Sequence, residues 1–210
     1  MKPHPYPTNR YIGRLIISML LALGLAPALA SWQESKPQTD SVLIPYTDND
    51  AYIIYAALLQ SAKGSSFVIR SETESRPSAT SENVGISGDR DFYKIWGQVL
   101  KDYASQYRSP KTLTRSIPMK VSYELITKQN LESILKSKGS WRTFYDLYPQ
   151  SNGYFWFSAV GFDSQKTHAI VSMGHSCGPL CGNGQPYFFE KKNGTWQKVS
   201  VHAQIQVWWS

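Results

Sequence analysis

The chain has 210 residues, which is enough for one domain with a substantial hydrophobic core. Its formal net charge is +7, but the basic residues are scattered along the sequence. The pair Lys191-Lys192 is too small to be the basic patch of a nucleic-acid-binding protein, so we expect no nucleic-acid partner.

The N-terminus has the three parts of a secretory signal peptide. Lys2, Arg10 and Arg14 form a basic region, residues 15–25 are apolar, and Ala28-Leu29-Ala30 fits the small-x-small cleavage rule. We expect a signal peptide at residues 1–30, cleavage after Ala30, and a periplasmic or secreted protein. An uncleaved membrane anchor is the alternative, but the apolar run is shorter than the roughly 20 residues needed to span a bilayer. No later segment is apolar enough to span a membrane.

Residues 31–47 are polar and contain two prolines, so we expect a mobile linker before a single domain at residues 48–210. Asp48-Asn49-Asp50 supplies N-cap chemistry for a helix that Gly64 ends. The short apolar run at 67–69 predicts a strand.

Residues 71–88 are rich in Ser, Glu and Thr, and we expect a solvated surface loop there, either ordered or disordered. A functional lid is the alternative. Residues 89–106 carry the clearest helical pattern, with an apolar stripe that should face the core. Its members are Phe92, Ile95, Trp96, Val99, Leu100 and Tyr103.

Alternation at residues 120–126 predicts another strand, and residues 131–139 a short helix that ends in glycine. Residues 141–149 predict an aromatic helix that Pro149 stops. Residues 154–210 then read as an antiparallel meander of short apolar runs, in which Asn193-Gly194 is a strong hairpin signal. We therefore predict a single α+β domain, with an antiparallel sheet built on this C-terminal β-meander and two or three helices on one face.

The tip of one hairpin carries both cysteines of the chain, Cys177 and Cys181. In an exported protein we expect them to form a disulfide that fixes the shape of a glycine-rich tip. A zinc site with His168 and His175 is an alternative, although the histidine spacing is unusual for one. A free reactive thiol is a second alternative.

Gly174-His175-Ser176-Cys177-Gly178 matches the G-x-S-x-G pattern of the nucleophile elbow. That elbow requires a turn into a helix, whereas Pro179 and further glycines follow here. The enzymatic alternative is a small hydrolase or transferase that uses Ser176 or Cys177 with His175 or His202.

The sequence shows neither a pair of catalytic carboxylates nor a glycine-rich phosphate-binding loop. Asp146 and Asp163 are single carboxylates in turn or cap contexts, and residues 181–184 are not followed by a helix that could hold a phosphate. We therefore assign no catalytic, cofactor-binding or metal residues. The chain has seven Trp and thirteen Tyr, and one of the adjacent Trp208 and Trp209 should stay partly exposed.

Five patterns in the C-terminal half resemble a group of exported bacterial proteins of unknown function. They are Trp141-x-x-Phe-Tyr-x-x-Tyr-Pro149, Phe157-Ser-x-Val-Gly-Phe162, Cys177-Gly-x-Leu-Cys-Gly-x-Gly184, Lys192-Asn-Gly-x-Trp196 and Trp209-Ser210. Residues 52–59 and 68–69 are similar as well. Ala159 stands where the pattern has Arg, and Asp163 where it has Asn. The resemblance implies an exported protein and supplies no catalytic residues.

The sequence thus favours a non-enzymatic binding or interaction module of the cell envelope. Its partner would be a protein or an envelope ligand, and no feature of the sequence sets its oligomeric state. In such a module Ser176 and Cys177 should lie at a closed tip, whereas in an enzyme one of them should face a pocket beside a histidine.

Overall fold

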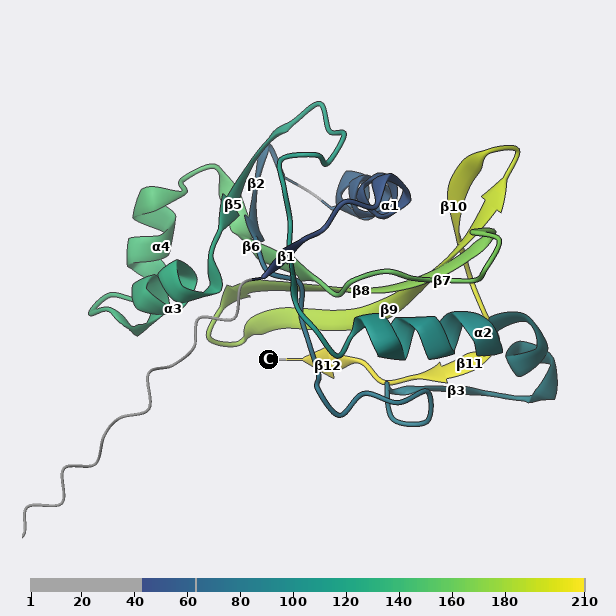
Figure 1. The fold of residues 1–210 in the computed structure, drawn as a ribbon. Coiled ribbons are helices and arrows are strands. Elements are labelled where there is room, and N and C mark those ends of the chain that lie inside the picture. Colours follow the sequence, from purple (N-terminus) through teal and green to yellow (C-terminus); the bar gives the residue numbers. More distant parts are fainter. Residues whose placement is uncertain (1–42, 63, 210) are drawn as a thin grey trace, which may run out of the picture. The chain divides into compact units, whose positions relative to one another are not determined.

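A computed structural model describes residues 43–62 and 64–209 (Figure 1). The expected signal peptide, the cleavage site after Ala30 and most of the expected linker lie outside the described residues. The elements, in chain order, are β1 (Ile44–Pro45), α1 (Asn49–Gln60), β2 (Ser66–Arg70), β3 (Ile86–Gly88), α2 (Arg90–Gln106), β4 (Lys111–Thr112), β5 (Ser122–Ile126), α3 (Lys128–Lys136), α4 (Trp141–Leu147), β6 (Ser151–Phe157), β7 (Gly161–Phe162), β8 (His168–Gly178), β9 (Cys181–Lys192), β10 (Thr195–Val199), β11 (Ala203–Ile205) and β12 (Trp208–Trp209). Within the described ranges, no helix combines the length and apolarity needed to cross a membrane.

One mixed sheet organises these elements. Its strand order is β10-β9-β8-β6-β2-β5, with β12 paired to β9 and β7 to β8. The strands of the predicted meander are antiparallel neighbours, whereas β2 runs parallel to both β5 and β6. The α+β prediction is confirmed, and the structure adds an N-terminal strand inserted beside the meander.

Helices cover both faces of the sheet (Figure 1). On one face α1 packs through Tyr55, whose ring stacks on Phe157 with centroids 4.4 Å apart. On the other face α2 packs through Trp96, whose ring lies 5.0 Å from that of Phe188. The pair α3 and α4 covers the β2 end of this second face around Phe144. Three helices thus share one face, as predicted, and α1 occupies the opposite one.

The N-terminus of α1 is anchored by carboxylates. Asp48 caps the helix, accepting hydrogen bonds from the backbone N–H groups of residues 50 and 51. Asp50 Oδ1 accepts from Lys191 Nζ at 3.0 Å and from Trp196 Nε1 at 2.9 Å, which ties the helix to β9 and β10. Burial alone would raise the pKa of the Asp50 carboxyl, but the hydrogen bonds from Trp196 and Lys191 outweigh it and lower that pKa.

The folded domain begins earlier in the chain than the expected boundary at residue 48. β1 pairs with β4, and the side chain of Tyr46 is buried in the core. The Tyr46 hydroxyl accepts a hydrogen bond from the Val160 backbone N–H at 2.9 Å. The folded unit therefore includes residues before Asp48, because this phenol satisfies a buried backbone group that composition does not reveal.

The expectation of a solvated loop at residues 71–88 is wrong for part of the segment. Ser71, Thr73 and Ala79 are buried, and β3 pairs with β11. Thr73 Oγ1 accepts a hydrogen bond from the Lys111 backbone N–H at 2.9 Å, so burial leaves the hydroxyl satisfied. Polar composition predicted exposure, but short polar side chains that find backbone partners can be buried at little cost.

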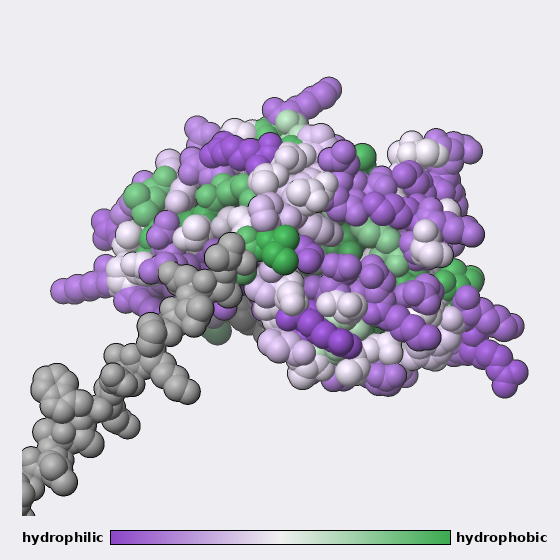
Figure 2. Space-filling model, viewed as in Figure 1, coloured by the Kyte–Doolittle hydropathy of each residue, from purple (hydrophilic) through white to green (hydrophobic). Residues whose placement is uncertain are grey.

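The stripe on α2 is buried as predicted except for Ile95, which is 53% exposed. Asp89 begins this helix by accepting a hydrogen bond from the Phe92 backbone N–H at 2.8 Å. On the face shown in Figure 2, apolar residues form small groups separated by hydrophilic surface.

Candidate functional site

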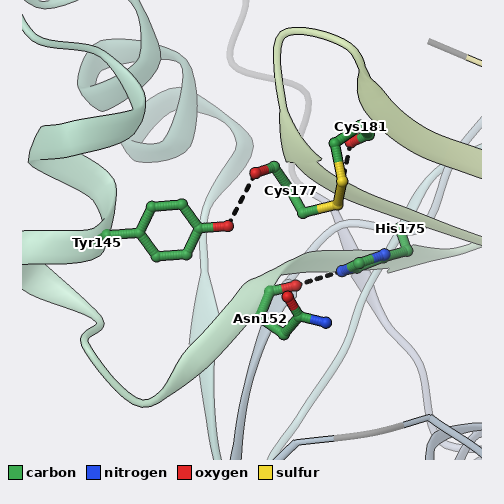
Figure 3. The surroundings of a disulfide bond; sticks show 5 residues. All are labelled: Tyr145, Asn152, His175, Cys177 and Cys181. Carbon is green, nitrogen blue, oxygen red and sulfur yellow. Dashed lines mark hydrogen bonds between the residues drawn. A yellow bond between two sulfur atoms is a disulfide. The ribbon is translucent and has the colours of Figure 1, made fainter.

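The two cysteines meet at the tip of the β8–β9 hairpin (Figure 3). Their sulfurs lie at disulfide distance and their Cα atoms are 5.1 Å apart. Leu180, within the short loop that they close, is 91% exposed. The cysteine pair thus closes the tip of the hairpin.

Neighbouring elements hold the base of the tip in place. The Tyr145 hydroxyl of α4 donates a hydrogen bond to the Cys177 carbonyl oxygen at 2.9 Å. The His175 ring hydrogen-bonds through Nε2 to the Asn152 carbonyl oxygen and stacks on Phe155 with centroids 4.4 Å apart. Figure 3 shows both side chains pointing at these backbone groups. His175 therefore serves β6–β8 packing.

Ser176 lies within β8, where it pairs with Tyr154 of β6 and Gly182 of β9. Since β8 continues to Gly178, the chain makes no strand-to-helix turn at this serine. Ser176 and His175 are adjacent in the strand, so their side chains point to opposite faces. The nucleophile elbow that G-x-S-x-G suggests is absent from this position.

The remaining histidines lie elsewhere. The His202 side chain is fully exposed, with Nδ1 3.9 Å from Asp89 Oδ2. His168 Nδ1 lies 2.9 Å from Asp163 Oδ2, which also accepts a hydrogen bond from the Thr167 hydroxyl at 2.6 Å. Burial would raise the pKa of the Asp163 carboxyl, but the hydrogen bonds from Thr167 and His168 lower it on balance. This cluster closes the turn before β8.

The zinc alternative requires His168 and His175 to converge on the cysteines. The two histidines are an odd number of residues apart on one strand, which directs their rings to opposite faces of the sheet. Across residues 43–62 and 64–209, no group of three or more His, Cys, Asp or Glu side chains could hold a metal ion.

A more open site lies on the sheet face that α2 covers. A cavity of about 500 Å³ is bounded there by α2, β6, β9 and β12 and by the segment after β2, and we call it the aromatic groove. Its volume lies within the roughly 300–1,000 Å³ of small-molecule sites. The aromatic residues that line it are Tyr103, Tyr107, Tyr154, Trp156 and Trp208.

Two glycines make room for the indoles of this groove. A Cβ on Gly174 of β8 would overlap the Trp156 ring. A Cβ on Gly184 of β9 would lie 2.9 Å from Trp156 Cζ2 and 2.5 Å from Trp208 Nε1. The two indoles thus lie against bare backbone, nearly parallel at 6° with centroids 6.1 Å apart. Trp208 stays 39% exposed, in line with the expectation for the terminal Trp pair.

Several polar side chains that line the groove are held in place by hydrogen bonds within the protein. The Arg70 side chain is mostly buried and pairs with Glu74, with Nη2 2.7 Å from Oε2. Arg70 Nε also donates to the Glu72 carbonyl oxygen at 3.0 Å. Nearby, the hydroxyls of Tyr103 and Ser172 are 2.8 Å apart. These bonds fix the groups before any ligand arrives, which reduces the entropy that binding costs.

Two phenols in the groove remain protonated at neutral pH. Burial raises the pKa of Tyr103. Burial also raises the pKa of Tyr107, reinforced by its neighbours Tyr103 and Glu74. Both are therefore neutral hydrogen-bonding groups in the physiological range.

The sequence indicated that one residue of the Trp208-Trp209 pair is exposed, but it did not reveal the groove. The available signal was Gly174 within a strand pattern, because an isolated glycine there indicates that another group approaches the backbone closely. Tyr154 and Trp156, two residues apart in a strand, were a second signal for one aromatic face. No protein-family model matches this chain, and no curated protein or solved structure is significantly similar to it.

Proposed function

We propose that this protein is an exported, non-enzymatic binding module of the cell envelope that holds its ligand in the aromatic groove. The observation that carries the proposal is the concave surface formed by Trp156 and Trp208 against two strand glycines, beside the paired Arg70 and Glu74. Aromatic faces flanked by a few fixed polar groups are typical of ligand sites.

Binding is favoured over catalysis because the reactive groups near the hairpin tip already have structural partners. The Cys177 sulfur lies at disulfide distance from Cys181, and the His175 ring contacts the Asn152 carbonyl oxygen. In the groove, Arg70 is neutralised by Glu74. Groups held in this way are suited to orient a ligand rather than to exchange protons with it.

The test is retention of the purified, signal-free protein by the sedimented envelope fraction of a bacterial cell. We expect the wild-type protein to co-sediment and the Trp208→Ala variant to remain largely in the supernatant. Tyr93→Ala is a matched control, because Tyr93 is 43% exposed, similar to Trp208, but does not line the groove. Equal retention of all three proteins, or none, would contradict the proposed function.

A further inference from the structure

We propose that the aromatic groove binds a linear β-1,4-linked pyranose oligosaccharide, whose sugar rings lie on the indoles of Trp156 and Trp208. This inference rests on the proposed binding function and adds the chemical class of the ligand.

The spacing of the two indoles defines how a ligand can use them. A flat ring held between two parallel rings needs about 3.5 Å on each side, or about 7 Å in total. The Trp156 and Trp208 centroids are only 6.1 Å apart, so no ring fits between them. A ligand must instead lie across their free surfaces. Each aromatic face is electron-rich and attracts the weakly positive C–H groups on the face of a pyranose chair.

The shape of the surface favours an extended chain with flat faces. Because Gly174 and Gly184 have no side chains, the two indoles lie directly against the strand backbone. A β-1,4-linked oligosaccharide is a ribbon with flat faces, whereas α-1,4 linkage coils the chain. The cavity of about 500 Å³ accepts a short oligosaccharide and is larger than a single ion requires.

The polar lining matches hydroxyl groups better than a strongly charged ligand. The charges of Arg70 and Glu74 neutralise each other, and Arg76 lies at the exposed margin, donating to the Asn83 carbonyl oxygen at 2.7 Å. Gln185 and Gln206 add planar amides to the lining. Each amide offers both a donor and an acceptor, which can serve two neighbouring hydroxyls of a sugar.

A proline-rich peptide is the competing ligand, because such peptides also bind aromatic-lined grooves. It is disfavoured here because the close indole pair leaves no slot into which a proline ring could insert between the two rings.

The experiment uses N,N′,N″-triacetylchitotriose and cellotriose as probes, with maltotriose and a ten-residue proline peptide as comparators. Isothermal titration calorimetry and tryptophan fluorescence would measure binding to the signal-free protein. We expect a β-1,4 trisaccharide to bind, and Trp208→Ala to weaken that binding by about tenfold or more. Tyr93→Ala should bind as the wild type does. Gln206→Ala, which keeps both indoles, should weaken binding less than Trp208→Ala, and circular dichroism would verify folding of each variant.

The ligand class would be overturned if neither β-1,4 trisaccharide binds, if maltotriose or the proline peptide binds better, or if Trp208→Ala leaves binding unchanged. Its failure is distinguishable from failure of the proposed function. Retention on the envelope fraction that depends on Trp208, but that neither β-1,4 trisaccharide inhibits, would leave the binding function standing and remove the glycan assignment.

Discussion

The Gly174→Ala substitution tests whether the floor of the aromatic groove depends on bare backbone. The added methyl would overlap the Trp156 indole. To restore the roughly 3.5 Å separation of nonbonded carbons, the ring would have to move by more than about 1 Å. Displacing a packed side chain in this way costs about 1–3 kcal/mol of unfolding free energy. We therefore expect Gly174→Ala to destabilise the wild-type protein by about that amount.

Once the indole is removed, the same substitution should raise the unfolding free energy instead of lowering it. In a Trp156→Ala background the methyl meets no ring, and alanine is favoured over glycine within a strand by roughly 0.5–1 kcal/mol. The double-mutant cycle should then give a coupling energy of about 1.5–4 kcal/mol between positions 174 and 156. Urea unfolding followed by circular dichroism measures the unfolding free energy of all four proteins. The m-value should be the same in each, so that the differences report stability alone.

A second glycine provides the control. A Cβ on Gly97 of α2 would meet nothing within 4 Å, so Gly97→Ala should stabilise both backgrounds by about 0.5–1 kcal/mol. If Gly174→Ala costs the same free energy with and without the Trp156 ring, the reasoning that the glycine exists to seat the indole is refuted.

Three other predictions concern separate parts of the chain. Because the folded-state pKa of Asp50 is lowered, its stabilisation should be complete above the ordinary value of 3.8 and lost as pH falls through the folded-state value. Asp50→Asn should therefore lower the unfolding free energy at neutral pH. It should also make the unfolding free energy fall less steeply with decreasing pH in the acidic range. An unchanged pH dependence would exclude this role of Asp50. The non-reduced protein should show no titratable thiol, and replacing Cys177 and Cys181 with serine should cost no more than about 2 kcal/mol in urea unfolding, given so short a loop. Protein isolated from a periplasmic or culture fraction should begin at Ser31 on N-terminal sequencing, whereas an intact Met1 would contradict cleavage after Ala30.

Sequence patterns among neighbouring residues predicted the helices and turns that depend on contacts between those same residues. The apolar stripe of α2 was recognisable because residues three and four apart share one face of a helix. The Cys177–Cys181 hairpin could be expected from glycines and cysteines close together in the chain. Burial of Tyr46 and Thr73 could not, because each depends on a backbone group far away in the sequence, at Val160 and Lys111.

Strand β2 shows the same difference between what the local sequence predicts and what depends on distant residues. Its apolar residues predicted a strand, but they did not specify neighbours, since any strand edge offers the same backbone hydrogen bonds. In the tertiary structure, Phe67 and Ile69 of β2 pack with α1 on one face, and Val68 packs with the α3–α4 pair on the other.

The sequence by itself determined the longer helices and strands, the α+β class and the cysteine-bearing tip, because helical and strand periods and short turns are set by neighbouring residues. Only the tertiary structure decided where a ligand could bind. The aromatic groove assembles α2, β6, β9, β12 and the segment after β2. Its surface exists because Gly174 and Gly184 lie under indoles from other strands, and no single segment of the chain shows which distant side chains will cover a glycine.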